Sequence, residues 1–124
     1  MKVFFPWLLT VSYMAAIYYI SDNPDSGAVL PAWYGADKVA HCTEFGILAV
    51  LIFSCVRVTF QASAAACQTA ATLMASLYAV LDEIHQHSVP NRTASVEDAM
   101  ADIAGAFLFA WWMKAILHRK KKKW

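Results

Sequence analysis

Long uncharged apolar stretches dominate the pattern of hydrophobic and polar positions along this chain. Residues 3–20 form 18 consecutive positions without a charged side chain, and residues 58–81 form 24. At the rise of an α-helix these stretches reach roughly 27 Å and 36 Å, which match a hydrocarbon core of about 30 Å. The pattern therefore predicts that both stretches are membrane-spanning helices.

Two further segments are apolar but begin with polar turns. Residues 37–56 carry two acids and a histidine in their first turns, and residues 97–117 carry three acids. Their apolar remainders are too short to span alone, so each crosses the membrane only if its polar turns belong to the helix. The sequence shows no internal repeat and no long β-alternation. We therefore predict an all-α integral membrane four-helix bundle, with residues 1–124 forming a single domain. Its helices are expected at about residues 3–20, 37–56, 58–81 and 97–117.

Composition supports a membrane protein. Hydrophobic residues make up 60% of the chain and charged residues 15%, whereas soluble domains are about half apolar and about a quarter charged. A small domain also buries the smallest fraction of its surface. These values exclude an ordinary soluble enzyme, a disordered chain and a coiled coil, and they indicate the lipid bilayer as the partner of the apolar surface.

The few charges are sorted along the chain. Eight of the ten basic residues fall on one side of the predicted spans: Lys2, Arg57, Lys114 and residues 119–123. All nine acids lie in or beside the other two connections, residues 21–37 and 82–97. Because basic residues flanking spans accumulate in the cytoplasm, we predict that both termini are cytoplasmic. A cleaved signal peptide is the alternative for the first span, but that span lacks a small-residue cleavage site.

Cysteines and the basic tail have simple interpretations. Cys42, Cys55 and Cys67 are scattered through predicted spans, which favours buried thiols over a disulfide framework or a cysteine metal site. The basic tail directly follows a span, so it sets topology and contacts anionic head groups. We therefore expect no nucleic-acid partner.

Polar side chains from three predicted helices gather at the outer face. Asp37, His41 and Glu44 stand at i, i+4 and i+7, so they share one helical stripe. The third helix ends in a polar group: Asp82, Glu83, His85, Gln86 and His87. A turn at Pro90 and Asn91 precedes Arg92.

The fourth helix adds a second acidic stripe. Ser95 and Asp98 have the spacing of a helix N-cap pair, and Asp98, Asp102 and Gly105 share a face on which Gly105 lets another helix approach closely. Singly, each polar residue has a structural explanation, such as a packing role for His41 or a bridge between helix ends for Arg92. Charged side chains inside spans are costly, however, and their convergence predicts a functional pocket in the outer leaflet.

These motifs carry a resemblance. They are Asp37-Lys38-Val39-Ala40-His41 with Glu44, Asp82-Glu83-Ile84-His85-Gln86, Val89-Pro90-Asn91-Arg92, and Asp98 with Asp102 and Gly105. In this order and spacing, over about residues 20 to 106, the chain resembles the VanZ-like family of small bacterial membrane proteins. The resemblance implies a four-helix protein of the bacterial cytoplasmic membrane and a link to tolerance of the glycopeptide teicoplanin. Two departures are His87-Ser88, where the family favours an aromatic, and Asp102, where Asn is frequent.

The first hypothesis is an enzyme, a hydrolase or transferase acting on a lipid-linked or cell-wall-related amphiphile. The candidate catalytic residues are His41, Glu83, Asp37, Glu44 and Asp98, and the candidate substrate-binding residues are Arg92, Gln86, Asp82 and Asp102. Arg92 is expected to clamp a phosphate or carboxylate. A divalent metal is compatible with His41, Glu44 and Glu83 as ligands, with Asp98 as an alternative, although the His41–Glu44 spacing is a weak signal.

The second hypothesis is a non-catalytic binding or accessory module. Its acidic cluster would capture a glycopeptide or a cell-wall precursor, or dock an envelope enzyme. The short chain leaves little room for an enclosed site, which favours this hypothesis or a homo-oligomer. An oligomeric transporter is the weakest alternative, because the acids and histidines within the predicted helices all lie in the outer halves, so no polar path through the membrane is visible.

The topology is testable with reporter fusions. Reporters fused at residues 30 and 90 should report the outer side of the membrane, and a reporter at the C-terminus should report the cytoplasm, because the basic residues stay inside. A cytoplasmic signal from either internal fusion would contradict the predicted orientation.

Overall fold

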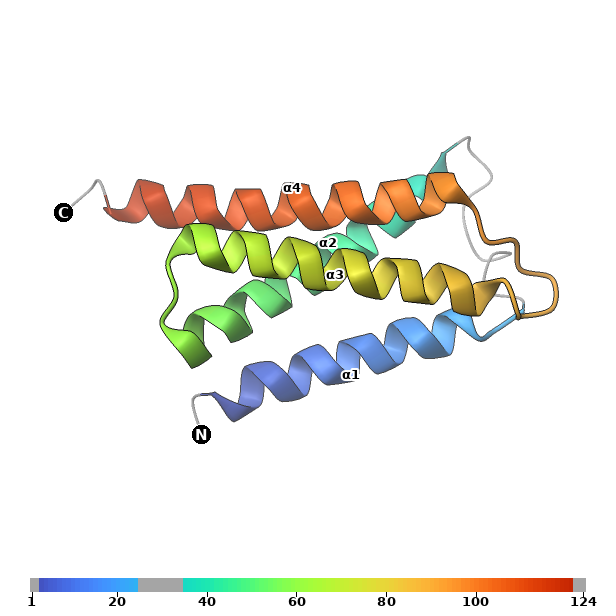
Figure 1. Cartoon of the computed structure of the whole chain (residues 1–124), viewed down its shortest axis with the longest axis horizontal. Coiled ribbons are helices and arrows are strands. Elements are labelled where there is room, and N and C mark those ends of the chain that lie inside the picture. Colours follow the sequence, from blue (N-terminus) through green and yellow to red (C-terminus); the bar gives the residue numbers. More distant parts are fainter. Residues whose placement is uncertain (1–2, 25–34, 122–124) are drawn as a thin grey trace.

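The computed structural model describes residues 3–24 and 35–121, which form four helices (Figure 1). Helix α1 spans Phe4–Ser21, α2 spans Ala36–Phe60, α3 spans Ala64–Gln86 and α4 spans Val96–Lys121. Each is long and apolar enough to cross a membrane. The all-helical four-span prediction is therefore confirmed, whereas the cytoplasmic location of both termini stays a prediction. Part of the first predicted loop, residues 25–34, and the end of the basic tail lie outside the described residues.

The turn between α2 and α3 lies five residues later than the charge pattern predicted. Helix α2 continues through Arg57, whose guanidinium donates a hydrogen bond to the carbonyl of Ala62 and so closes the turn. Gln61 provides the reversal with a left-handed φ of 52°. The hydroxyl of Ser63 then caps α3 by accepting the N–H of Ala66 at 3.2 Å. The predicted boundary beside Arg57 is wrong because this side chain serves the turn instead of ending the helix.

Helix α2 is the most enclosed element. Within its most apolar 18 residues 44% are buried, against 17% to 22% in the other helices. It packs against α4, α3 and α1. The core combines large α2 side chains with small residues of the two neighbours: Phe45, Leu48, Ile52 and Phe53 with Cys67, Ala71, Ala75, Ala79, Ala106 and Ala110. Small residues allow close helix packing in lipid, where no hydrophobic force drives helices together.

The backbones of α2 and α4 approach closely at Gly105. A Cβ atom at this position would overlap the backbone carbonyl of Cys42. The close approach that the sequence predicted at Gly105 is thus confirmed, and its partner is the residue next to His41.

The bundle has one polar end. In Figure 1 the start of α1 and the end of α4 lie at the same end as the α2–α3 turn, and the end of α3 and the start of α4 lie at the opposite end. We call this opposite end the polar end, because it carries the acids of α2, α3 and α4 together with His41, His85 and His87. Elsewhere all four helices expose large apolar side chains, including Phe4, Ile47, Leu73 and Phe107. This surface indicates contact with the bilayer.

Substitution of Gly105 should destabilise the bundle. Gly105→Ala forces α2 and α4 apart, and overpacking of this kind costs about 1–3 kcal/mol or more of the free energy of unfolding. Thermal unfolding of the purified protein in detergent measures this. Gly46→Ala is the matched control, because the three atoms nearest to its new Cβ belong to the side chain of Phe109, which can shift, whereas at Gly105 they belong to the backbone of Cys42. Equal unfolding temperatures for the two variants would contradict the assigned contact.

Candidate functional site

Three helices bring one histidine and several charged groups together at the polar end. We call this group the acid–histidine cluster: Lys38 and His41 of α2, Glu83 of α3, and Asp98 and Asp102 of α4. The Nδ1 atom of His41 lies 3.0 Å from Oδ1 of Asp102, and its Nε2 atom lies 3.9 Å from Oδ1 of Asp98. Asp102 is 0% exposed. The two acids of α4 therefore hold the ring of His41 from two sides.

Lys38 and Ser95 organise the rim of this cluster. The ammonium of Lys38 forms ion pairs with Asp98 and, at 3.1 Å, with Asp37. The hydroxyl of Ser95 donates to Oδ2 of Asp98 at 2.8 Å and accepts the N–H of Asp98 at 3.0 Å. The predicted cap pair of Ser95 and Asp98 is confirmed. Asp37 lies at the rim, where its side chain is 49% exposed.

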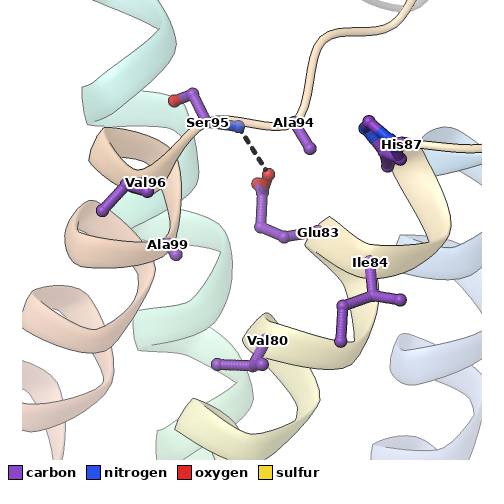
Figure 2. Close-up of a pocket in the computed structure, with 8 residues that line it drawn as sticks. All are labelled: Val80, Glu83, Ile84, His87, Ala94, Ser95, Val96 and Ala99. Carbon is purple, nitrogen blue, oxygen red and sulfur yellow. Dashed lines mark hydrogen bonds between the residues drawn. The ribbon is translucent and has the colours of Figure 1, made fainter.

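Glu83 is buried with its two oxygens in different environments. Oε2 accepts the backbone N–H of Ser95 at 3.0 Å, as Figure 2 shows, and Oε1 is buried without a hydrogen-bond partner. Oδ2 of Asp102 is likewise buried without one. Buried polar atoms are nearly always paired, because an unpaired one loses its hydration without replacement. These two oxygens therefore call for a functional explanation.

A second network joins α1 to α3 and the following loop. The hydroxyl of Ser21 donates to Oδ2 of Asp82 at 2.8 Å, and the amide of Gln86 donates to the same oxygen at 2.9 Å. Arg92 donates to Oε1 of Gln86 at 2.9 Å. We call these four residues the Ser21 network. Asp82 and Gln86 share a face as predicted, but the part played by Ser21 was missed, because a serine at the end of an apolar span has no distinctive pattern.

His85 in the last turn of α3 and His87, which directly follows that helix, lie apart from the acid–histidine cluster. The Nε2 atom of His85 is 3.1 Å from Oδ1 of Asp22, and the ring stacks on Tyr18 with a centroid distance of 4.6 Å. His87 is exposed. The acid–histidine cluster thus contains only one of the three histidines at the polar end.

The structure brings a different set of metal-ligating groups together from the one expected. Among the described residues, His41, Glu83 and Asp102 each offer a ligand atom, and these atoms all lie within 4.8 Å of one another. Glu44, expected in this set, is half-buried on the same stripe of α2 and is not part of it. Asp102 takes its place because the close packing at Gly105 sets α4 against His41.

Two hollows border the cluster. One, the polar pocket, has a volume of about 190 Å³ and is lined by Asp37, His41, Gln86, Asn91, Arg92, Thr93 and Asp98. The other, the apolar groove, has a volume of about 450 Å³ and runs between α3 and α4 (Figure 2). It is lined by Val80, Glu83, Ile84, His87, Ala94, Ser95, Val96 and Ala99. Because His41 lines the first and Glu83 the second, the cluster forms the wall between them.

Comparison with known proteins gives one match. A family model described as VanZ/LLP1 matches residues 3–118 of the chain, which includes all of the site residues described above. No curated protein matches the chain, and no solved structure matches it.

Proposed function

The chain belongs to the VanZ/LLP1 family and is a multi-pass membrane protein, and we propose that it binds a lipid-linked amphiphile of the bacterial cell envelope at the junction of the polar pocket and the apolar groove. Glu83 carries this proposal. Its carboxylate lines the apolar groove, and one ligand atom from it lies within 4.8 Å of His41 in the polar pocket. An amphiphile needs such a junction, because its two parts prefer different surroundings.

The apolar groove suits the hydrocarbon part. Val80, Ile84 and Val96 line it and are 42%, 63% and 76% exposed, so a chain can enter from the surface that faces the bilayer. Its volume of about 450 Å³ lies within the range of about 300–1,000 Å³ typical of small-molecule sites. Figure 2 shows the groove ending near Ser95 and His87, where α3 gives way to the loop.

The polar pocket suits an anionic head group. Arg92 lines it beside Asn91 and Thr93, and its guanidinium is oriented by the hydrogen bond to Gln86. A guanidinium binds phosphate or carboxylate with two parallel hydrogen bonds. The head group is therefore expected to contact Arg92 while the chain lies in the apolar groove.

A hydrolase or transferase reaction on the bound head group is the second candidate function. The pairing of His41 with the buried Asp102 favours it, since a buried carboxylate fixes the orientation of an imidazole that moves a proton. Asp98 faces the Nε2 edge of the same ring within the polar pocket. In this reaction His41 is the proton-transfer group and Asp102 is a positioning residue.

The sorted charges support an orientation in which the polar end faces outward from the bacterial cytoplasmic membrane, with both termini in the cytoplasm. In that position the site meets lipid-linked precursors of the cell wall. The family resemblance also supports a role in teicoplanin tolerance, with the site acting on an envelope amphiphile or binding the glycopeptide itself.

Blocking the apolar groove should weaken lipid binding. Ile84→Trp is expected to lower the affinity for a polyprenyl phosphate at least about tenfold, equal to about 1.4 kcal/mol, measured by native mass spectrometry in detergent. Leu77→Trp is the matched control, because Leu77 lies two helical turns earlier on α3, is also 63% exposed and does not line the groove. Equal affinities for the two variants would refute the groove as the chain-binding site. Equal binding of the matching polyprenol would refute the role of the polar pocket.

The phenotype separates binding from catalysis. Expression in a teicoplanin-sensitive bacterium should raise the inhibitory concentration of teicoplanin, and His41→Ala should remove this effect because it empties the centre of the cluster. His118→Ala, at the far end of α4 and exposed, should leave the effect intact. Glu83→Gln keeps an oxygen for the N–H of Ser95, so a binding protein tolerates it, whereas a reaction in which Glu83 exchanges a proton with the head group does not. A fully active His41→Ala variant would remove the acid–histidine cluster from the function.

A further inference from the structure

We propose that His41, Glu83 and Asp102 hold one divalent transition-metal ion, such as Zn²⁺ or Mn²⁺, in the wall between the polar pocket and the apolar groove. The three residues come from three different helices, and one ligand atom from each lies within 4.8 Å of the other two. At these distances the three ligand atoms need to move only a little to bind the same ion. This proposal goes beyond amphiphile binding and does not depend on it.

Two unpaired carboxylate oxygens are the independent evidence for an ion; the other buried oxygens without a partner among the described residues are the hydroxyls of Thr72 and Ser76, which lie outside the three-residue group. Oε1 of Glu83 and Oδ2 of Asp102 are buried without a hydrogen-bond partner, and their side chains belong to residues that are 7% and 0% exposed. Both residues are members of the three-residue group. A cation bound there would supply the partner that Oε1 of Glu83 and Oδ2 of Asp102 lack, while Oε2 of Glu83 keeps the N–H of Ser95 and Oδ1 of Asp102 keeps His41.

The charge balance of the polar end also favours a cation. Six described carboxylates there are buried or half-buried: Asp37, Glu44, Asp82, Glu83, Asp98 and Asp102. The cations of the same region are Lys38, which pairs with Asp37 and Asp98, and Arg92, which donates to Gln86. Oε1 of Glu83 and Oδ2 of Asp102 accept no hydrogen bond from either side chain. A divalent ion would offset the negative charge that these two carboxylates leave at low dielectric.

The surroundings of the three residues resemble the supports of a metal site. The N–H of Ser95 fixes Oε2 of Glu83, which leaves Oε1 for the ion. Such outer hydrogen bonds orient metal ligands and tune their basicity. One imidazole and two carboxylates favour a transition metal over Mg²⁺ or Ca²⁺, and a set of three ligands leaves a position open. That position lies where the two hollows meet, so the ion would attract an anionic head group.

Metal analysis of the full chain in detergent tests the site. After chelation, the protein is dialysed against Zn²⁺ or Mn²⁺, and bound metal is measured by plasma mass spectrometry, with Mg²⁺ and Ca²⁺ for comparison. We expect one retained transition-metal ion per chain and no retained Mg²⁺ or Ca²⁺. Glu83→Gln should lower the affinity for the metal at least tenfold. Glu44→Gln makes the same carboxylate-to-amide change on the stripe of α2 that carries His41, outside the three-residue group, and should leave the metal affinity unchanged.

Three results would overturn the proposal. The first is that the wild-type chain retains no metal, and the second is that Glu83→Gln and Glu44→Gln lose metal affinity equally. The third comes from the absorption spectrum of the protein loaded with Co²⁺: a thiolate charge-transfer band would place the ion at a cysteine. If Glu83→Gln does not fold, the wild-type chain still decides, because a metal that binds only the folded state raises its unfolding temperature. Lipid binding is measured separately, so loss of the metal site and loss of the lipid site are distinguishable.

Discussion

The close contact between the backbones of α2 and α4 is the constraint on which the polar end depends. Gly105 lies against the carbonyl of Cys42, and a side chain there would force the helices apart. His41 precedes Cys42 directly, and Asp102 lies one turn before Gly105 on α4. The contact therefore sets the 3.0 Å distance between His41 and Asp102. A bundle in lipid has no hydrophobic force to hold its helices together, so a small residue at this position supplies the close packing instead.

Helix α3 divides the polar end into a structural side and a chemical side. Asp82 joins Ser21 and Gln86 in a network in which the Ser21 hydroxyl donates to Asp82 and the Gln86 amide donates to both Asp82 and Ser21. Its neighbour Glu83 points about 100° away around the helix, toward α4, where one carboxylate oxygen is left without a partner. Consecutive residues thus serve different purposes. The satisfied network ties α1 to the bundle, and the proposed metal site would use the oxygen of Glu83 that has no partner.

Four helices offer room for a site because the site uses two surfaces of the bundle. The apolar groove opens between α3 and α4, and the polar pocket opens among the loop and the ends of α2, α3 and α4. Under the proposed function neither hollow has to be enclosed, since the bilayer would cover the hydrocarbon part of a ligand and the cluster beside the hollows would contact its head. The short chain leaves little room for an enclosed site, but a site formed by two open hollows does not need that room.

The sequence by itself determined the four apolar helices, the group of polar residues and the small residue at Gly105, because hydropathy, charge and helical period are local properties. Only the tertiary structure decided which partners meet. It replaced Glu44 by Asp102 beside His41 and Glu83, because the choice depends on how α4 is rotated against α2, which no spacing within one helix records. It also placed the α2–α3 turn after Arg57. The charge of Arg57 had predicted the turn at this residue, but its side chain reaches forward and donates a hydrogen bond to the carbonyl of Ala62 in the turn.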